Sequence, residues 1–205
     1  ELIYRDAITD FFKDEFWSDC QDVLNAYRDG NVCFVNPVRA ATGDFKTLPG
    51  LLLDPRFAEL FTEEERAAAR EFIPFTHIFK KEKVEYEGKK DVDLVTLVKE
   101  NKDKFVLKPN EGYGGFGIYI GPSCEQKEWE EAVEKSLTPP NEYAVQEFVD
   151  IPTDRFPIME GDQLKGWVDK NVNINFWSHG GEFAGAFLRA ADGTLINVHQ
   201  GGGLV

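Results

Sequence analysis

The sequence has 205 residues, of which 42% are apolar and 13% aromatic, and this composition is typical of a folded globular protein. Acidic residues number 37 against 23 basic ones, giving a formal net charge of -14, so nucleic acid is not an expected partner. No apolar run approaches the roughly 20 residues that span a bilayer, so no membrane partner is expected either. Three widely spaced cysteines without metal-ligand spacing favour a reducing, cytoplasmic setting.

The first half of the chain is expected to alternate short strands with helices that end at glycine or proline. The expected elements are a strand at Leu2–Arg5, a helix over residues 11–28, a strand at Val32–Val35, a loop leading into a short helix over 38–50, and a hairpin or loop over 80–90. Gly30 ends the first helix. Thr62 and Glu65 have the spacing of a capping box, which begins a further helix that ends before Pro74.

The middle of the chain has a clearer pattern of strands and helices. The expected elements are a helix at Asp93–Lys99, strands at Lys104–Lys108 and Ile118–Ile120, a helix after residue 123, and a strand at Tyr143–Phe148. Ser123 and Gln126 have capping-box spacing at the start of the second helix, whose apolar face includes Trp129.

From about residue 165 the apolar residues recur at every second position, which is typical of antiparallel strands. Apolar and polar side chains alternate there, as Val168, Val172, Ile174 and Phe176 with Asp169, Asn171, Asn173 and Asn175. Gly180-Gly181 is expected to turn the chain into a return strand at Phe183–Arg189, and Asp192-Gly193 to turn it again into Leu195–Val198. Period two places Phe183, Gly185, Phe187 and Arg189 on one face, which predicts a partly buried arginine that binds an anion.

A glycine-rich loop follows the strand that ends in Lys108, with glycines at positions 112, 114, 115 and 117. Glycines let successive backbone N–H groups turn inward as an anion-binding nest, and the ammonium of Lys108 adds a full positive charge beside it. A strand follows this loop, whereas a helix follows the Walker loop. The pattern predicts that nucleotide phosphates bind between Glu111–Gly117 and Lys108, and the alternative is a plain hairpin turn with flexible glycines.

Lys108-Pro109, the glycine hairpin and Val145–Val149 together resemble the nucleotide site of the ATP-grasp superfamily. Within it, the chain resembles the circularly permuted ligases of the glutathione synthetase and glutathionylspermidine synthase type. Further segments resemble these enzymes in the same order along nearly the whole chain, namely Ile3–Asp6, Asn36-Pro37 with Gly43 and Lys46, and Arg189 with Gly201–Gly203. The resemblance implies an α+β ATP-grasp fold of mostly antiparallel sheets with flanking helices, and a nucleotide cleft between two lobes.

The resemblance also implies how the chain is divided. Residues 1-75 would form a partial central lobe with a substrate-side strand and helices, residues 76-149 a lid lobe with the glycine-rich hairpin, and residues 150-205 an antiparallel core lobe. Further metal ligands of such enzymes would precede Glu1, in an upstream part of the same polypeptide.

Roles for individual residues follow from the same resemblance. Lys46 and Lys108 would hold ATP phosphates together with the loop backbone at Gly112, Gly114 and Gly115. Glu111 would bind magnesium. The strand backbone at Gln146, Glu147 and Val149 would form the adenine edge, and Arg5 and Arg189 would hold substrate carboxylates. The asparagine row adds Asn173 as a candidate ligand of the metal or the ribose, because asparagine is a poor strand former and its presence favours a polar ligand on that face.

Each of these residues also has a purely structural alternative. Lys46 and Glu111 would then be solvated loop residues, Arg5 would pair with Asp6, and Glu147 would be an ordinary strand end. The asparagine row would be the wet face of an antiparallel strand. Arg189 would extend to solvent or pair with Asp192.

The activity implied by the resemblance is that of an ATP-dependent carboxylate–amine ligase. Such an enzyme transfers the γ-phosphate of ATP to a carboxylate, and an amine then displaces phosphate from the acylphosphate to form a peptide-like bond. The implied cofactors are ATP and Mg2+, and the implied partners are a small-molecule carboxylate and an amine. Two alternatives remain open: a nucleotide-binding module without ligase activity, and a phosphotransferase that stops at phosphorylation.

Overall fold

The computed structural model of the protein describes residues 1–5, 17–196 and 203–204. Its helices are α1 (Trp17–Arg28), η2 (Val38–Asp44), α2 (Leu48–Leu53), η3 (Pro55–Leu60), α3 (Glu63–Phe72), α4 (Leu94–Glu100), η4 (Lys102–Lys104), η5 (Gly121–Ser123) and α5 (Gln126–Ser136), where η denotes a 3-10 helix. Its strands are β1 (Leu2–Tyr4), β2 (Cys33–Val35), β3 (Thr76–Ile78), β4 (Lys83–Tyr86), β5 (Lys89–Asp93), β6 (Phe105–Pro109), β7 (Tyr119–Ile120), β8 (Tyr143–Glu147), β9 (Thr153–Glu160), β10 (Gln163–His179), β11 (Glu182–Ala191) and β12 (Gly203–Leu204). None of the described helices combines the length and apolar character needed to cross a bilayer.

The central sheet is antiparallel, with strand order β3-β8-β6-β7, and its two faces differ in character. Alternate residues of β6 and β8, including Phe105, Leu107 and Val145, are fully buried in a core that also contains Trp129 of α5. The indole Nε1 of Trp129 donates to the carbonyl of Val98 at 3.1 Å, which ties α5 to α4. The other face carries Val106, Lys108, Ala144, Gln146 and Thr76, because paired residues of an antiparallel sheet point to the same side.

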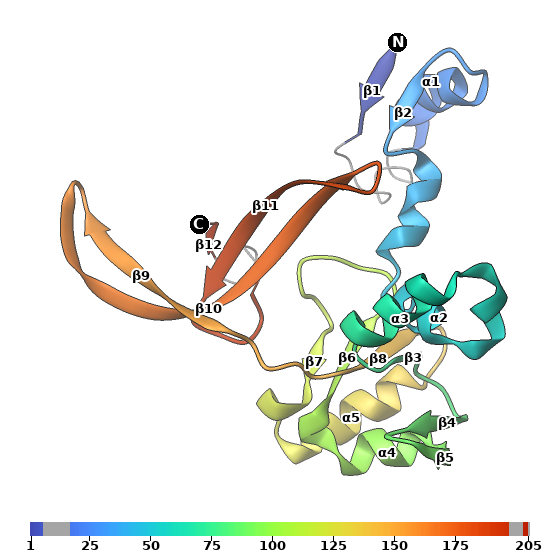
Figure 1. Cartoon of the computed structure of the whole chain (residues 1–205), viewed down its shortest axis with the longest axis vertical. Coiled ribbons are helices and arrows are strands. Elements are labelled where there is room, and N and C mark those ends of the chain that lie inside the picture. The colour runs from blue at the N-terminus through green and yellow to red at the C-terminus, as the bar shows by residue number, and fades with distance from the viewer. Residues whose placement is uncertain (6–16, 197–202, 205) are drawn as a thin grey trace.

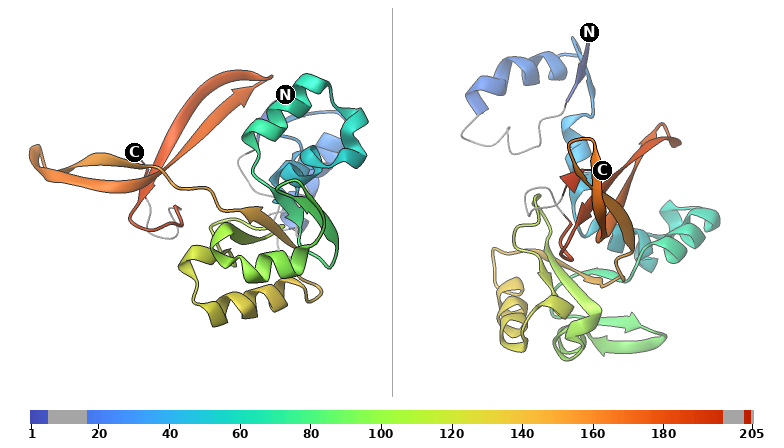
Figure 2. Two further views of the ribbon diagram at one scale, coloured as in Figure 1. Left: turned by 60° about the horizontal axis from the view of Figure 1, so that its bottom comes forward. Right: turned by 90° about the vertical axis from the view of Figure 1, so that its left-hand side faces the viewer.

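The helices α4 and α5 lie together on one side of this sheet, as Figures 1 and 2 show. The capping chemistry of the sequence explains where two helices begin. Thr62 and Glu65 form the expected capping box at the start of α3, and the Asp93 carboxylate accepts from the backbone N–H of Thr96 at 2.8 Å at the start of α4. Because α4 and α5 pack on one face of the central sheet, they do not cover the opposite face, which carries Lys108 and Gln146.

A second antiparallel sheet, with order β12-β11-β10-β9, extends away from α4 and α5 (Figure 1). The 17-residue strand β10 pairs with β9 through its first half and with β11 through its second half. Gly180 and Gly181 both have positive φ and form the expected turn between β10 and β11. Phe176 and Phe183 are each 72% exposed on this hairpin, so the sheet leaves aromatic surface uncovered in the described structure.

One face assignment on the return strand is wrong. Phe187 and Arg189 share a face as predicted, but Phe183 packs edge-on against Phe176, with ring centroids 6.1 Å apart. Phe176 pairs with Ala186 and therefore lies on the opposite face. A register shift between Trp177 and Ser178 inserts an extra residue into the return strand, and this bulge reverses the direction of every side chain before it.

Two other expectations are also wrong. Ser123 does not cap α5, because it lies in η5 and the helix begins at Gln126 without a side-chain cap. The hydroxyl of Ser123 instead lies 3.1 Å from that of Thr194. Leu195 and Ile196 do not form a strand, the rest of that predicted element lies outside the described residues, and β12 pairs with β11 in the described structure. The short strand β3 and the long strand β9 were not expected from the sequence.

The pattern-based expectations for the other elements are confirmed to within a few residues. The hairpin expected at 80–90 is the β4–β5 hairpin, which runs from Lys83 to Asp93 and whose turn includes Gly88 with φ of 75°. The first helix is described from Trp17 to Arg28 and is followed by Gly30 with φ of 75°, whereas its predicted start at 11–16 lies outside the described residues. The α+β class with mostly antiparallel sheets is confirmed. The division into three lobes stays a prediction.

Gly121 provides a test of this packing. A Cβ on Gly121 would lie 1.8 Å from the carbonyl oxygen of Lys102, a backbone atom that cannot move without η4. We expect Gly121→Ala to lower the free energy of unfolding by about 3 kcal/mol, the upper part of the range for overpacking. A Cβ on Gly166 would have nothing within 4 Å, so Gly166→Ala is the matched control. Urea denaturation of both variants measures the difference in stability. Equal midpoints for the two variants would contradict the close approach of Gly121 to the Lys102 carbonyl.

Candidate functional site

Two lysines from distant parts of the chain meet at the end of β6. Lys108 lies on β6, and Lys46 lies just before α2, in a segment held by Asn110. The backbone N–H of Lys46 donates to the Asn110 carbonyl at 3.1 Å. The side-chain oxygen of Asn110 accepts from the backbone N–H of Thr47 at 3.1 Å and from its hydroxyl at 2.8 Å. Asn110 and Thr47 are both buried, so these hydrogen bonds fix the first lysine segment against the strand that carries the second.

Neither ammonium is neutralised in the described part of the chain. Lys108 Nζ donates to the neutral amide oxygen of Gln146 at 2.5 Å, and Lys46 Nζ donates to the carbonyl of Asp44 at 2.7 Å. No described carboxylate forms an ion pair with either lysine. Burial lowers the pKa of Lys108, and the nearby charge of Lys46 lowers it further. The site therefore concentrates positive charge in a protein whose net charge is -14.

The glycine loop begins directly after Asn110. Its four glycines, at positions 112, 114, 115 and 117, all have positive φ, of 137°, 73°, 80° and 71°. Side chains other than glycine rarely adopt this conformation, so the loop geometry requires these residues. Glu111 and Gly112 are exposed, while Gly114 is buried. Leu195 packs on Gly115, where a Cβ would lie 3.0 Å from its nearest atom, so the loop contacts the segment after β11.

The three residues of the predicted adenine edge lie at or just after the end of β8. Gln146 pairs with Val106 on one side and with Thr76 on the other, and the backbone N–H of Glu147 donates to the Phe75 carbonyl at 2.8 Å. The sheet thus uses the backbone of both residues. Val149 lies beyond β8, is 60% exposed, and makes no backbone hydrogen bond to another described residue. Of the three predicted residues, Val149 has the backbone that is best placed to contact a ligand.

The side chain of Glu147 has a structural partner. Its carboxylate accepts from the hydroxyl of Tyr86 at 3.2 Å. Burial, assisted by the charges of Glu147 and Glu87, raises the pKa of Tyr86 far above its usual value, so the phenol stays protonated as the donor. The carboxylate of Glu147 is therefore already hydrogen-bonded to Tyr86 and is not a free group for a nucleotide.

The two predicted substrate arginines lie in different settings. Arg5 donates from Nε to the carbonyl of Asn36 at 3.0 Å and from Nη2 to that of Pro37 at 3.4 Å, so its guanidinium stabilises the turn that leads to Lys46. Its predicted partner Asp6 lies outside the described residues. Arg189 is partly buried, and its guanidinium lies 5.1 Å from the centre of the Phe187 ring.

The surroundings of Arg189 exclude one structural alternative. Asp192 pairs with Lys170 at 2.7 Å and not with Arg189. Asn173 lies directly opposite Arg189 on β10, and its side-chain oxygen accepts from the amide of Asn175 at 2.7 Å. Of the terminal glycines, Gly203 is described and pairs with Ala190. A carboxylate-binding role for either arginine stays a prediction.

The candidate magnesium ligands are Glu111 and Asn173. Glu111 is an exposed carboxylate at the start of the glycine loop, and Asn173 is an exposed amide on β10. No group of three or more histidine, cysteine, aspartate or glutamate side chains with metal-site geometry occurs among the described residues. A magnesium ion bound with a nucleotide takes one or two protein carboxylates, several waters and phosphate oxygens. The carboxylate of Glu111 fits that pattern, whereas the side-chain oxygen of Asn173 already accepts from Asn175.

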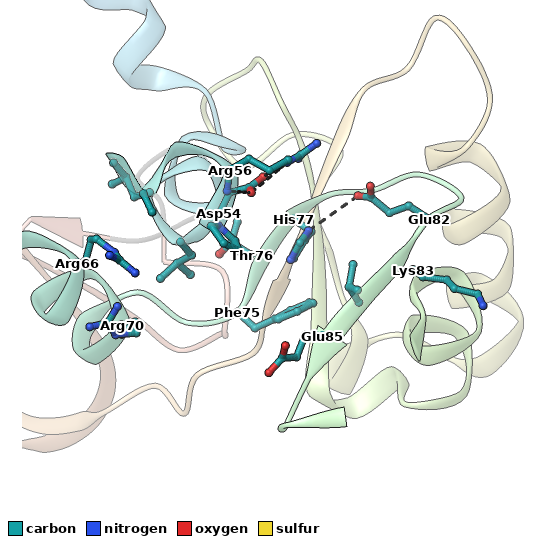
Figure 3. Close-up of a pocket in the computed structure, with 15 residues that line it drawn as sticks. Asp54, Arg56, Arg66, Arg70, Phe75, Thr76, His77, Glu82, Lys83 and Glu85 are labelled. Carbon is teal, nitrogen blue, oxygen red and sulfur yellow. Dashed lines mark hydrogen bonds and ion pairs between the residues drawn. The ribbon is translucent and has the colours of Figure 1, made fainter. Parts of the chain in front are cut away.

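A cavity of about 710 Å³ lies elsewhere, between the α2–η3–α3 segment and strands β3 and β4 (Figure 3). It contains neither lysine of the site. Most of its charged groups are already paired: Arg56 with Asp54, Arg66 and Arg70 with Glu63, and Glu82 with Lys80. Because most charged side chains that line the cavity already form ion pairs, they have less unbalanced charge to offer an ionic ligand than Lys46 and Lys108 have.

Sequence reasoning missed two residues that build the site. Asn110 was not singled out from the sequence, yet it joins the two lysine segments. Thr76 was not singled out, because the strand β3 that carries it has only three residues and no visible periodicity. The position of Asn110 directly after the strand-ending Lys108-Pro109 was the one sequence signal available for it.

Comparisons with known proteins agree with this arrangement. A family model described as a circularly permuted ATP-grasp matches residues 3–146, which include Lys46, Lys108 and the glycine loop. A protein of Frankia casuarinae named "Putative glutamate--cysteine ligase 2-2" is 36% identical over 116 residues, which cover 55% of this chain and 13% of that protein. Uncharacterized proteins of Synechocystis sp. and Mycobacterium tuberculosis are 24% and 27% identical over 99% of this chain, covering 41% and 36% of their own lengths.

The chain thus spans less than half the length of each of these relatives. The matched region contains the buried sheet, both lysines and the loop with its four left-handed glycines. Sequence similarity and site geometry therefore agree, and the chain belongs to the circularly permuted ATP-grasp family.

Proposed function

We propose that this chain supplies the nucleotide-binding machinery of an ATP-dependent carboxylate–amine ligase that acts through an acylphosphate. The single observation that carries the proposal is the pair of ammonium groups, Lys46 and Lys108, with no acid partner among the described residues. Two cations without an acid partner among the described residues, on segments joined by the buried hydrogen bonds between Thr47 and Asn110 and beside a glycine-rich loop, fit a polyphosphate. The ligase class is supported by the family and by the name of the Frankia relative.

In this proposal the residues of the chain bind and orient the phosphates. Lys108 and Lys46 neutralise charge on the phosphate oxygens, and the backbone N–H groups of the loop surround them. Val149 contacts the adenine edge through its main chain. Positioning and electrostatic stabilisation account for most catalysis of phosphoryl transfer, so no covalent nucleophile on the protein is needed.

Magnesium belongs to the same proposal. When bound with ATP, it neutralises phosphate charge and polarises the transferred phosphoryl group. Glu111 would hold it from the loop side, and Asn173 is a second candidate from β10. Arg189, opposite Asn173, would bind a substrate carboxylate in a planar two-pronged contact. Three cysteines without metal-ligand spacing favour a cytoplasmic, reducing setting.

The reaction separates this proposal from its alternatives. A ligase releases phosphate from ATP only when both the carboxylate and the amine are present, whereas a phosphotransferase accumulates a phosphorylated product without an amine. A nucleotide-binding module does neither. Phosphate release by the full-length protein, measured with and without candidate amines, distinguishes the three.

Removing either lysine should weaken ATP binding. We expect Lys108→Ala and Lys46→Ala each to cost about 1.5–3 kcal/mol of ATP binding free energy, the range for hydrogen bonds to charged groups. Titration calorimetry on the full-length protein measures the change. The matched control is Lys127→Ala, whose side chain is 89% exposed on α5. Equal ATP affinity in all four proteins would exclude the phosphate-binding role of the pair.

Nucleotide binding should also take up a proton at alkaline pH. Burial and Lys46 lower the pKa of Lys108 in the free protein, and a bound polyphosphate would raise it again. Between these two pKa values the complex holds more protons than the free protein, so ATP affinity falls as pH rises through that window. Calorimetry in buffers of different ionisation enthalpy measures the uptake. In Lys108→Ala the uptake should disappear, and an unchanged uptake would assign it to another group.

A further inference from the structure

Thr76 lies at the centre of a short chain of polar contacts that ends at Lys108. It is on β3, is 1% exposed, and lies directly opposite Gln146 in the sheet. Figure 3 labels it with its chain neighbours Phe75, which precedes β3, and His77, which is also on β3. Because Thr76, Gln146 and Lys108 project from the same face, the three side chains form a row across β3, β8 and β6.

The hydrogen bonds in this row have a fixed direction. The Thr76 hydroxyl donates to the carbonyl of Pro74 at 2.8 Å, which uses its only proton. Toward Gln146 it can then only accept, and the amide Nε2 of Gln146 donates to it at 2.9 Å. The amide oxygen of Gln146 therefore faces Lys108 Nζ, at 2.5 Å. A reversed amide would place its two N–H donors against the three donors of the ammonium.

We propose that Thr76 is a positioning residue for the phosphate-binding lysine: its hydroxyl orients the Gln146 amide, and the amide oxygen holds the Lys108 ammonium in place. The inference rests on the proposed role of Lys108 toward ATP phosphates. Because the holding group is a neutral amide, it fixes the ammonium without neutralising it. A carboxylate in the same place would form an ion pair and compete with phosphate.

The direction of these hydrogen bonds also explains why threonine suits position 76. Asparagine or glutamine would add a second group that can reverse its own donor and acceptor ends, whereas a hydroxyl that has committed its proton to Pro74 can only accept. Serine would supply the same hydroxyl with one methyl group less. Valine would keep a similar shape and remove both hydrogen bonds, leaving the Pro74 carbonyl and the Gln146 amide without this partner.

The test compares ATP with adenosine in the full-length protein. We expect Thr76→Val to weaken ATP binding roughly threefold to tenfold, the effect of one neutral hydrogen bond, and to leave adenosine binding unchanged. Thr76→Ser should restore ATP affinity. In a Lys108→Ala background, Thr76→Val should have no further effect on ATP, because the two residues act through one contact. Thr138→Val is the matched control, since the Thr138 hydroxyl also donates to a carbonyl at 2.8 Å but lies after α5.

The outcomes separate this inference from the proposed function. If Lys108→Ala weakens ATP binding and Thr76→Val does not, the positioning role is wrong and the phosphate role stands. If Lys108→Ala has no effect, the phosphate role fails, and the inference about Thr76 fails with it. If Thr76→Val weakens ATP and adenosine equally, Thr76 supports the fold in general and the positioning role is again wrong. Thermal unfolding of Thr76→Ser and Thr76→Val establishes that the compared proteins are folded.

Discussion

Two ammonium groups held close together, without an acid partner in the part of the chain that the structure describes, are the physical constraint on which the site depends. Like charges repel, and burial increases the cost of keeping Lys108 protonated, as its lowered pKa shows. Such a pair persists only where the surrounding structure holds it. The described contacts that hold them are neutral, because they are the side-chain amide oxygen of Gln146 and the backbone carbonyl of Asp44. The charge is therefore left for a ligand, which is the simplest physical reason for the arrangement.

The fold supplies the rigidity that this constraint requires. One face of the central sheet packs on α4 and α5 through side chains that are fully buried, including Phe105, Leu107 and Trp129. That packing fixes β6 and β8, and with them the distance between Lys108 and Gln146. The opposite face is then free to be polar. Asn110, which directly follows β6, fixes the position of Lys46 as well, because it accepts three hydrogen bonds from Lys46 and Thr47 in the segment that precedes α2.

The sequence predicted this site unevenly, and the reason lies in the range of the interactions. Lys108, the glycines and the strand at β8 were found because their signals are local: a strand end, residues that tolerate positive φ, and a buried apolar run. The family resemblance supplied Lys46, for which spacing alone gives no partner. Asn110 and Thr76 were missed because their roles arise from contacts 63 and 70 residues away, which no local pattern records.

The same distinction explains the errors on the return strand. Period two assigned Phe183 to the face of Phe187 and Arg189, and that reasoning holds only while the register is unbroken. The bulge at Trp177 and Ser178 adds one residue, with Gly185 at φ of 139° adopting the unusual conformation. Glycine within a strand is the sequence signal for such a break. The predicted partly buried setting of Arg189 survived because the arginine lies beyond the bulge, in the regular part of the pairing.

The two four-stranded sheets meet at the glycine loop. Leu195, which follows β11, packs on Gly115, and the hydroxyl of Thr194 lies 3.1 Å from that of Ser123, just after β7. The turn before them is anchored to β10, because Lys170 pairs with Asp192 and the Asn171 amide donates to the carbonyl of Gly193 at 3.0 Å. The loop is thus held by rigid β6 on one side and by the β10–β11 hairpin on the other. Because both of these sheets contact segments beside the loop, an anion bound by the loop backbone would connect them.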